Sequence, residues 1–308
     1  MSQLPKILVV YYTQTGQLKR IIDHVLAPLQ GKAEITFEEI EPVEDFPFPW
    51  PKQRFFDTMP ETVLGRPKAI QPLKTDPGAH YDLVLLAYQP WFLSPSQPIA
   101  AFLQSEEGKR LLKGKPVVTL LGCRNMWINA QEKVKRYLQA AGAQLAGHIA
   151  LVDKHPNLVS LITILRWATK GKKDAFFIFP PAGVQEKEIV ESSRFAAPIG
   201  EALGKKDFSR LHSELLALNS VEVDPGLIVL EMRGVKPFRF WANYISAAGE
   251  PGSPARQGRV TMYRVILLAA IPILTPFTTI AGWLKLTLAK KQLNSDVTYY
   301  KGIQLREN

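Results

Sequence analysis

The stretch that decides the fold is ILVVYYTQTGQ, residues 7–17, close to the start of the chain. Its six leading apolar residues predict a buried strand, and the polar segment Thr13–Gln17 follows without a gap. Apolar residues then recur every three or four positions from Leu18 to Leu29, which predicts an amphipathic helix. A loop of hydroxyls and free backbone N–H groups at the start of a helix suits a phosphate. Because the loop holds no lysine, it is not a Walker-type nucleotide loop.

The composition is that of a globular protein with a basic second half. With 308 residues, 46% of them hydrophobic and 21% charged, the chain can bury one large core or two ordinary ones. A single cysteine, Cys123, and a start that leads straight into a strand predict a cytoplasmic protein without disulfides. Residues 153–308 hold 21 Lys and Arg against 14 Asp and Glu, whereas residues 1–152 hold 17 against 14. We expect lipid head groups as the anionic partner and no nucleic acid, since no nucleic-acid-binding motif is recognisable.

Strand and helix patterns alternate along the first two thirds of the chain. Such alternation predicts an α/β fold with a doubly wound parallel sheet, and five strands in the order 2-1-3-4-5 are the simplest assembly. A closing helix is expected at Val184–Leu203, which gives a domain over residues 1–205 with an insertion at 153–183. Residues 206–308 then form a long, basic, hydrophobic C-terminal extension. The predicted strands are 7–12, 33–40, 82–88, 115–121 and 147–152, and the predicted helices are 18–29, 99–112 and 129–141.

Two stretches interrupt this alternation. Residues 41–80 hold eight of the 24 prolines, interleaved with Phe and Trp, so long regular elements are not expected there. This proline-rich segment is either a lid over a hydrophobic ligand or an ordered surface loop. Residues 153–183 combine an apolar helical stretch, a basic end and the run Phe176–Phe179. We expect this insertion to lie in a membrane interface, to roof a lipid pocket or to fill a core.

Polar and aromatic loops follow three of the predicted strands. In open α/β sheets, ligands bind beyond the carboxyl ends of the strands, near the point where the strand order reverses. The first strand precedes Thr13–Gln17, the third precedes Gln89–Pro98, and the fourth precedes Gly122–Asn129. Aromatic faces at Trp91 and Trp127, together with amides in these loops, suit a flat cofactor such as a flavin.

The first loop resembles the FMN-phosphate loop of the flavodoxin-like family, except that Leu18 stands where that family has a hydroxyl. The stretch Pro90–Leu103 is similar to one in flavin reductases of the same superfamily. The resemblance implies a flavodoxin-like fold with FMN as the cofactor. The FMN-binding residues expected in the three loops are Thr13, Gln14, Thr15, Gly16, Gln17, Leu18, Gln89, Pro90, Trp91, Phe92, Leu93, Ser94, Gly122, Cys123, Arg124, Asn125 and Trp127.

Segments 12–18 and 122–127, together with the basic and hydrophobic tail, resemble the bacterial dialkylresorcinol-condensing-enzyme family. The resemblance implies flavin-dependent oxidation of a 2,5-disubstituted cyclohexane-1,3-dione to a dialkylresorcinol. The substrate is then lipid-like, and a ketosynthase partner is expected to make the dione. Such an oxidation needs a base, a group that stabilises an enolate and a hydrophobic slot for two chains.

Three residues are candidates for the catalytic groups. His148 and His155 lie in or after the fifth predicted strand and are candidate bases, whereas Arg124 is placed to stabilise negative charge. Cys123 is expected to be a bystander thiol. No group of His, Cys and Asp has metal-ligand spacing, so no metal is expected. The alternative functions are a membrane-associated NAD(P)H:quinone reductase, an electron carrier and a non-catalytic membrane adaptor.

An uncharged run of 20 residues, 265–284, lies near the end of the chain. That length is enough to cross a bilayer, but basic residues flank both ends, and Pro272 and Pro276 interrupt the run. We therefore expect an in-plane or re-entrant membrane-associating segment at 263–289, with 256–291 as the membrane contact. The protein is then peripheral or monotopic at the inner face of the membrane. A true span, and burial in a core or a homodimer interface, are the alternatives.

Overall fold

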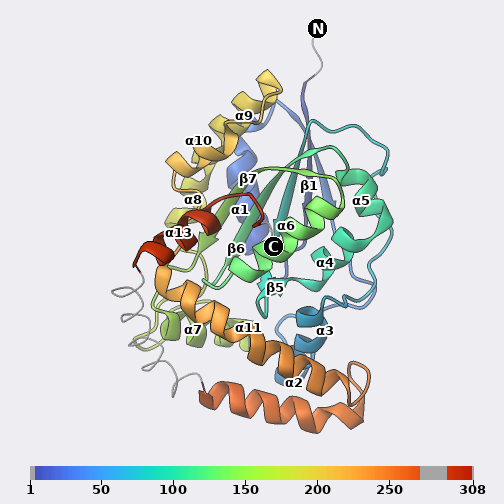
Figure 1. The fold of residues 1–308 in the computed structure, drawn as a ribbon, viewed down its shortest axis with the longest axis vertical. Coiled ribbons are helices and arrows are strands. Elements are labelled where there is room, and N and C mark those ends of the chain that lie inside the picture. The colour runs from blue at the N-terminus through green and yellow to red at the C-terminus, as the bar shows by residue number, and fades with distance from the viewer. Residues whose placement is uncertain (1–3, 271–289, 307–308) are drawn as a thin grey trace.

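A five-stranded parallel sheet forms the centre of the molecule (Figure 1). The structure, a computed structural model, describes residues 4–270 and 290–306. The strand order is β2-β1-β3-β6-β7, which becomes 2-1-3-4-5 when only the strands of this sheet are counted. This is the flavodoxin-like order, so the predicted α/β fold is confirmed. The strands are β1 (Lys6–Tyr11), β2 (Glu34–Glu39), β3 (Leu83–Tyr88), β6 (Pro116–Cys123) and β7 (Gln144–Val152).

Helices cover both faces of the sheet because neighbouring residues of a strand point to opposite sides. On β1, Ile7 and Val9 pack in one hydrophobic core, and Leu8 and Val10 pack in the other. All four side chains are fully buried. The first face is covered by α1 (Gln17–Leu26), η1 (Ala27–Leu29), α8 (Glu186–Glu191), η2 (Ser192–Phe195), α9 (Ala196–Lys205) and α10 (Leu211–Ala217), and the second by α4 (Gln97–Gln104), α5 (Glu106–Leu112) and α6 (Ile128–Ala140).

Two predicted helices are divided in the structure. The segment 99–112 divides at Ser105, whose hydroxyl accepts a hydrogen bond from the Gly108 N–H at 3.0 Å and so starts a new helix, α5. The expected closing helix Val184–Leu203 consists of α8, the short 3₁₀ helix η2 and α9. Pro198 lies in the first turn of α9, where the missing N–H leaves no hydrogen bond unmade.

Apart from the last helix, α13, the remaining helices gather beyond the carboxyl ends of the strands, at the lower end of Figure 1. The proline-rich segment is ordered and contains two short helices, and the insertion contains α7. A long helix, α11, crosses this end, and a helix over residues 254–270 packs beside it. The bounds are α2 (Lys52–Asp57), α3 (Met59–Leu64), α7 (Asn157–Lys170), α11 (Pro225–Ser246) and α13 (Lys290–Lys301).

The C-terminal part of the chain packs against the sheet. α10 belongs to the core on the α1 face, and Val221 bridges to Ala150 of the edge strand β7. The domain boundary after residue 205 stays a prediction. The prediction of a membrane-associating segment at 263–289 falls largely on residues 271–289, which lie outside the described residues. Within residues 4–270 and 290–306, no helix combines the length and the apolar character that a bilayer span requires.

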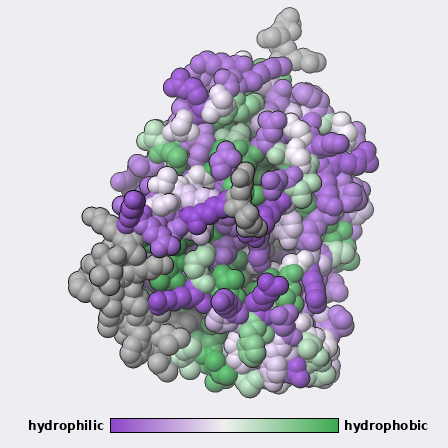
Figure 2. Space-filling model, in the orientation of Figure 1, coloured by the Kyte–Doolittle hydropathy of each residue, from purple (hydrophilic) through white to green (hydrophobic). Residues whose placement is uncertain are grey.

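Apolar side chains are unevenly spread over the surface. In the view of Figure 2, hydrophilic residues dominate the upper part, and apolar ones are frequent at the lower end. Phe240 of α11, for example, is 62% exposed, and Val265 is 57% exposed. The apolar end of the molecule is therefore also the end at which the strands of the sheet finish.

Candidate cofactor and substrate cavity

A cavity of about 610 Å³, the main cavity, opens beyond the carboxyl ends of β1, β3 and β6. All three predicted loops contribute to its lining, as expected at the point where the strand order reverses. Its volume is in the range of sites for cofactors and other small ligands. The lining residues from these loops and the start of α1 are Gln14, Thr15, Gln17, Leu18, Gln89, Pro90, Trp91, Phe92, Leu93, Gly122, Cys123, Arg124 and Met126.

The first loop leads directly into α1 and leaves the start of this helix open. The N-cap residue is Gly16, which has no side chain to cap the helix and a φ of 76° that glycine adopts without strain. Thr13 Oγ1 accepts a hydrogen bond from the Gly16 N–H at 3.2 Å, and Thr15 Oγ1 accepts one from the Gln17 N–H at 3.5 Å. Backbone N–H groups at an open helix start suit an anion.

Gln17 fixes this loop to the segment that follows the insertion. Its side chain donates to the Val184 carbonyl at 3.3 Å and accepts from the Val184 N–H at 3.1 Å. The buried Asp153 carboxylate accepts from the neighbouring Gly183 N–H at 3.3 Å. A Cβ on Gly183 would stand 2.8 Å from both Gln17 and Trp167, so only glycine fits there. Gln17 therefore positions the loop as well as lining the cavity.

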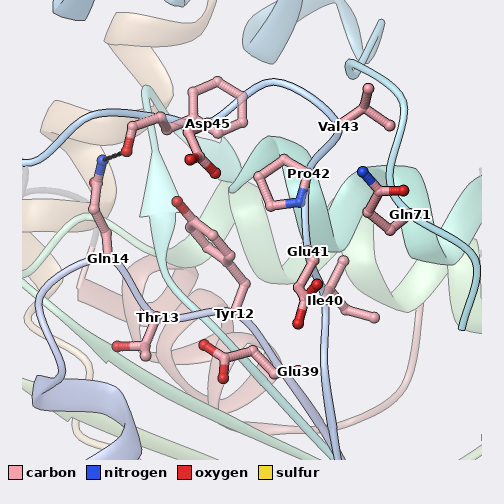
Figure 3. Close-up of a pocket in the computed structure, with 11 residues that line it drawn as sticks. Tyr12, Thr13, Gln14, Glu39, Ile40, Glu41, Pro42, Val43, Asp45 and Gln71 are labelled. Carbon is pink, nitrogen blue, oxygen red and sulfur yellow. Dashed lines mark hydrogen bonds between the residues drawn. The ribbon is translucent and has the colours of Figure 1, made fainter. Parts of the chain in front are cut away.

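A second cavity of about 470 Å³, the acidic cavity, adjoins the same loop (Figure 3). Tyr12 and Asp45 point toward each other in it, and burial, with a contribution from Asp45, raises the pKa of the Tyr12 hydroxyl. Thr13 lines this cavity, and Gln14 lines both cavities while donating to the Phe46 carbonyl at 3.4 Å. Because three carboxylates line the acidic cavity, an anionic ligand is better placed in the main cavity.

The second loop contains a tight β-hairpin that the sequence does not predict. β4 (Pro90–Trp91) pairs with β5 (Ser94–Pro95), and Phe92 and Leu93 form the turn with φ values of 46° and 59°. Left-handed backbone is strained at bulky residues, and turns of this kind usually carry Asn and Gly. Packing maintains the turn, since the Phe92 ring lies 5.0 Å from the ring of Phe55 and Leu93 is buried.

Trp91 stands in a cluster of aromatic rings. Its ring centroid lies 5.0 Å from that of Phe46, 5.6 Å from that of Trp50 and 5.9 Å from that of Tyr12, all edge to face. Phe46 and Trp50 belong to the proline-rich segment. This segment therefore packs its own aromatics against the flavin loop predicted from the sequence, and Trp50 also lines the main cavity.

A partly buried lysine ties the hairpin to α6. Lys133 Nζ donates to the Ser94 hydroxyl at 2.7 Å and to the Val63 carbonyl at 2.8 Å. Burial lowers the pKa of Lys133 to about 8. Ser94 is itself buried and is not among the residues that line the main cavity. Its hydroxyl maintains the shape of the hairpin.

The third loop brings a guanidinium to the cavity wall. Arg124 donates to the side-chain oxygen of Asn157 at 2.7 Å and to its carbonyl at 3.1 Å, which fixes the guanidinium at the start of α7. Burial lowers the pKa of Arg124 to about 10, so the group stays charged at neutral pH. Burial also raises the pKa of the neighbouring Cys123 thiol, which keeps it protonated. A charge held in a half-buried position suits an anionic oxygen of a ligand.

Some predicted FMN-binding residues lie outside the lining of the main cavity. Leu18 lines it but is only 1% exposed and packs in the core beneath α1. Asn125 is buried and donates to Asn157 Oδ1 at 3.3 Å, and Trp127 is buried in the core on the α6 face. The side chains of Asn125 and Trp127 therefore support the third loop from its buried side. The predicted residues outside the lining are Thr13, Gly16, Ser94, Asn125 and Trp127.

Neither candidate histidine lines the main cavity. His148 is fully buried within the sheet, with Nδ1 2.8 Å from the Thr119 hydroxyl, and burial lowers its pKa well below the ordinary value. Its side chain is structural, so the suggestion that it is a base is withdrawn. His155 follows β7, and its Nδ1 lies 2.6 Å from Asp153 Oδ1. The same Asp153 oxygen accepts from the His155 backbone N–H at 3.0 Å, so this carboxylate fixes His155 outside the cavity lining.

Three helices close the main cavity with mostly apolar side chains, to which α11 adds the cation of Arg233. α7 of the insertion thus forms part of the cavity wall, whereas the expectation that it roofs a lipid pocket stays a prediction. The lining residues of α11 recur at helical spacing, which is visible in the sequence, but the sequence does not show that this helix lies over the site. The roof residues are Leu161, Ile164, Leu165, Trp167 and Ala168 of α7, Leu230, Arg233, Gly234, Pro237, Phe238 and Trp241 of α11, and Tyr263, Ile266, Leu267, Leu268 and Ala270.

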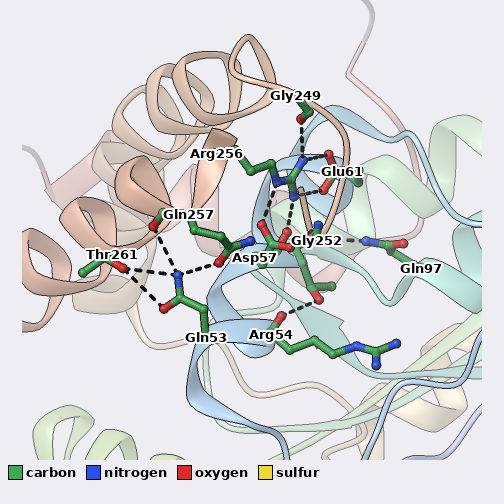
Figure 4. A network of polar contacts seen from close by, with 11 residues as sticks. Gln53, Arg54, Asp57, Glu61, Gln97, Gly249, Gly252, Arg256, Gln257 and Thr261 are labelled. Atoms are coloured by element: carbon green, nitrogen blue, oxygen red, sulfur yellow. Dashed lines mark hydrogen bonds and ion pairs between the residues drawn. The ribbon is translucent and has the colours of Figure 1, made fainter. Parts of the chain in front are cut away.

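Buried charges attach this roof to the rest of the molecule. The Arg256 guanidinium donates to Asp57 Oδ1 at 2.6 Å and to the two oxygens of Glu61 at 2.8 and 3.0 Å (Figure 4). The Arg256 side chain is fully buried. Glu231 of α11 is also buried and accepts hydrogen bonds from the first two backbone N–H groups of α6, at 3.2 and 2.7 Å. A carboxylate at this position stabilises the start of a helix.

No protein-family model matches the chain, and a search among curated proteins finds no match. Among solved structures, a flavoprotein from Lactobacillus acidophilus in complex with FMN is 18% identical with a TM-score of 0.38, covering 47% of this chain and 93% of its own. A flavodoxin from the domain Archaea is 10% identical with a TM-score of 0.35, covering 65% and 99%. The Trp repressor binding protein from Bacillus subtilis is 12% identical with a TM-score of 0.29, covering 54% and 98%.

Replacing Arg256 with Met leaves Asp57 and Glu61 as buried carboxylates without their partner. Breaking a buried ion pair from one side costs about 3–5 kcal/mol, so we expect the free energy of unfolding to fall by about that amount. Urea unfolding followed by circular dichroism measures it. Arg210→Met, at a side chain that is 83% exposed, is the control and should change stability by less than about 0.5 kcal/mol. Equal urea midpoints for the two variants would show that the ion pairs do not hold the roof.

The lowered pKa of Lys133 predicts a pH dependence of stability. Below about pH 8 the lysine is charged in both states, whereas between about pH 8 and 10.5 the folded state has released its proton and the unfolded state has not. The unfolded state then binds more protons, so the free energy of unfolding rises with pH. We expect the stability of the wild type relative to Lys133→Met to increase from pH 7 to pH 10 in urea titrations. A stability difference between the two proteins that stays constant or decreases from pH 7 to pH 10 would contradict the lowered pKa of Lys133.

Proposed function

We propose that the protein is an FMN-dependent oxidoreductase that acts on a lipid-like substrate. The observation that carries the proposal is the lining of the main cavity, which combines the loop at the open start of α1 with apolar side chains of three roof helices. FMN needs both kinds of surface, because it has a phosphate at one end and a flat, largely apolar ring system at the other. The remaining apolar wall is suited to alkyl chains of a substrate.

The residues present fit FMN at the phosphate end and along the walls. No heavy atom beyond the chain neighbours lies within 4 Å of where a Cβ on Gly16 would stand, so the helix start is open to a ligand. Thr15 lines the cavity beside it and has a hydroxyl. Leu18 offers no hydroxyl, so the phosphate depends on Thr15 and on backbone N–H groups. Trp91 and the hairpin turn supply aromatic and apolar surface for the ring.

FMN, when bound, supplies an acceptor for a hydride. The chain contributes positioning, charge and the exclusion of water. Arg124, held by Asn157, is placed to stabilise negative charge on a substrate oxygen in a site of low polarity. The apolar residues of α7 and α11 exclude water and orient an apolar substrate. We assign no base, because neither histidine reaches the cavity lining.

The finer proposal is that the substrate is a dialkyl-cyclohexanedione and the product a dialkylresorcinol. Conversion of such a dione to the aromatic product removes two hydrogen atoms, one as a proton and one as a hydride. The family resemblance of segments 12–18 and 122–127 suggests this reaction, and two observations support it. The cavity has an apolar wall for the chains, and Arg124 provides a cation for the enolate oxygen.

The first test asks whether FMN binds and where its phosphate lies. Thr15→Glu places a carboxylate at the start of α1, and we expect it to weaken FMN binding at least about 100-fold by charge repulsion. Riboflavin has no phosphate, so its affinity should change only a few-fold. Fluorescence titration of the apoprotein measures both. Ser209→Glu, on an exposed residue between α9 and α10, is the control. Wild-type protein that takes up no FMN would overturn the proposal.

The second test asks whether the apolar wall binds the substrate. Ile164→Asn adds an amide to the α7 side of the main cavity, and a polar group without partners in an apolar site costs about 1–3 kcal/mol. We expect the variant to bind FMN normally but to need about 10- to 100-fold more dione for anaerobic bleaching of the flavin absorbance. Val190→Asn, at a residue of α8 that is 49% exposed, should behave as the wild type. Equal dione requirements for all three proteins would place the substrate elsewhere.

The same spectroscopic experiment separates the alternatives. Rapid NAD(P)H oxidation with quinones and no bleaching by diones would favour the NAD(P)H:quinone reductase, for which the apolar wall is equally suited. A colourless protein that accepts no flavin would favour a non-catalytic membrane adaptor, for which the missing hydroxyl at Leu18 is the supporting observation.

A further inference from the structure

A turn near the end of the insertion carries two apolar side chains that are almost fully exposed. In this aromatic turn, residues 176–179, Phe177 is 100% exposed and Ile178 is 90% exposed. Backbone hydrogen bonds of 3.0 and 2.8 Å join Phe176 and Phe179, and their rings stack with centroids 5.0 Å apart. The turn is thus an ordered structure that presents its two apolar tip residues outward. Exposed apolar groups on an ordered element indicate an interaction surface.

The rest of the turn is held firmly against α7. The Arg166 guanidinium lies 4.4 Å from the ring centroid of Phe176 and donates to the Asp174 carbonyl at 2.7 Å and to its carboxylate at 3.1 Å. Phe177 has a φ of 48°, a left-handed conformation that is unfavourable for an aromatic residue. An exposed phenylalanine at such a position adds nothing to packing, and glycine would adopt the backbone more easily.

The segment that leads into the turn is rich in positive charge. Between residues 166 and 179 the chain has four cationic side chains and one carboxylate, and that carboxylate, Asp174, is paired with Arg166. Lys170 and Lys172 are exposed, and Lys173 is half-buried. Apolar tip residues within a basic surround match the two layers of an anionic bilayer, acyl chains beneath charged head groups.

The exposed apolar surface continues toward the main cavity. On the outer side of α7, Leu158 is 38% exposed and Ile162 is 36% exposed, one helical turn apart. Leu161 and Ile164 of the same helix line the main cavity. Val265, which is 57% exposed, comes directly before cavity residues of the helix over 254–270. A bilayer that met the aromatic turn would therefore lie beside the apolar roof of the cavity.

We propose that the aromatic turn inserts into an anionic lipid bilayer, with Phe177 and Ile178 among the acyl chains and the lysines at the head groups. A second copy of this chain fits less well, because the net charge of +10 makes the contact of two basic faces repulsive. Two tip residues are also too small an area for a stable protein interface. The inference does not depend on the proposed function, since membrane binding is measured without flavin or substrate.

The test is co-sedimentation of the full-length protein with vesicles of phosphatidylcholine, with and without phosphatidylglycerol. We expect wild-type protein to bind the anionic vesicles, and Phe177→Ser/Ile178→Ser to lower the partition coefficient at least about tenfold. Lys170→Gln/Lys172→Gln should lower binding to anionic vesicles about fivefold per lysine at low salt and leave binding to neutral vesicles unchanged. The control is Phe37→Ser/Val190→Ser, two apolar residues that are 43% and 49% exposed on other elements.

A single substitution separates membrane insertion from a role in folding. Phe177→Gly relieves the left-handed backbone and removes the apolar ring, so the thermal midpoint should stay equal or rise while vesicle binding falls. Phe177→Trp should retain binding, and its added tryptophan emission should be quenched by brominated lipids.

Three results would overturn the proposal. They are wild-type protein that stays in the supernatant with both vesicles, tip variants that bind as the wild type does, and tip variants whose only change is a loss of self-association in sedimentation velocity without lipid.

Discussion

The guanidinium of Arg256, buried between Asp57 and Glu61, joins the C-terminal helices to the proline-rich segment. A buried charge that loses its ion-pair partners is strongly destabilising, so this contact permits few relative positions of the two segments. Gln53 reinforces it by donating to the Gln257 side chain at 2.7 Å. Both segments border the main cavity, and so the shape of the cavity depends on a contact that lies outside it. Glu231 fixes α11 in a similar way, because its carboxylate accepts a hydrogen bond from the Asn129 N–H at the start of α6.

The sheet was predictable because its signals are local. Four of the five strands are short apolar runs, the exception being β2 with its three glutamates. Each covering helix has its own periodicity, and the strand order follows from simple rules for parallel sheets. The placement of the roof helices against the rest of the molecule has no such local signal. Glu231 and Asn129 are 102 residues apart, and Arg256 and Asp57 are 199 apart, so no window of sequence shows which charge meets which. Ser105 shows a smaller difficulty, since a single side chain divides one expected helix into two.

The three predicted loops converge on the main cavity, but several of the predicted side chains do not line it. The rule of strand order identifies where loops converge, but it does not say which way a residue points. Trp127 ends its loop and turns into the core, where its ring lies 5.1 Å from that of His148. His148 pairs in register with Thr119 inside the sheet rather than at its end. The hairpin turn at Phe92 and Leu93 lacks the residues that usually form such turns. Its geometry is fixed by the residues packed around it, and therefore no local sequence pattern predicts it.

That hairpin has a consequence for how the protein can change over evolutionary time. Selection for stability alone would favour Asn and Gly at positions 92 and 93, where the backbone is left-handed. The same replacement would remove two side chains from the wall of the main cavity. Under the proposed function, stability and ligand recognition therefore act in opposite directions at these two positions. Their present residues record which of the two demands has had priority.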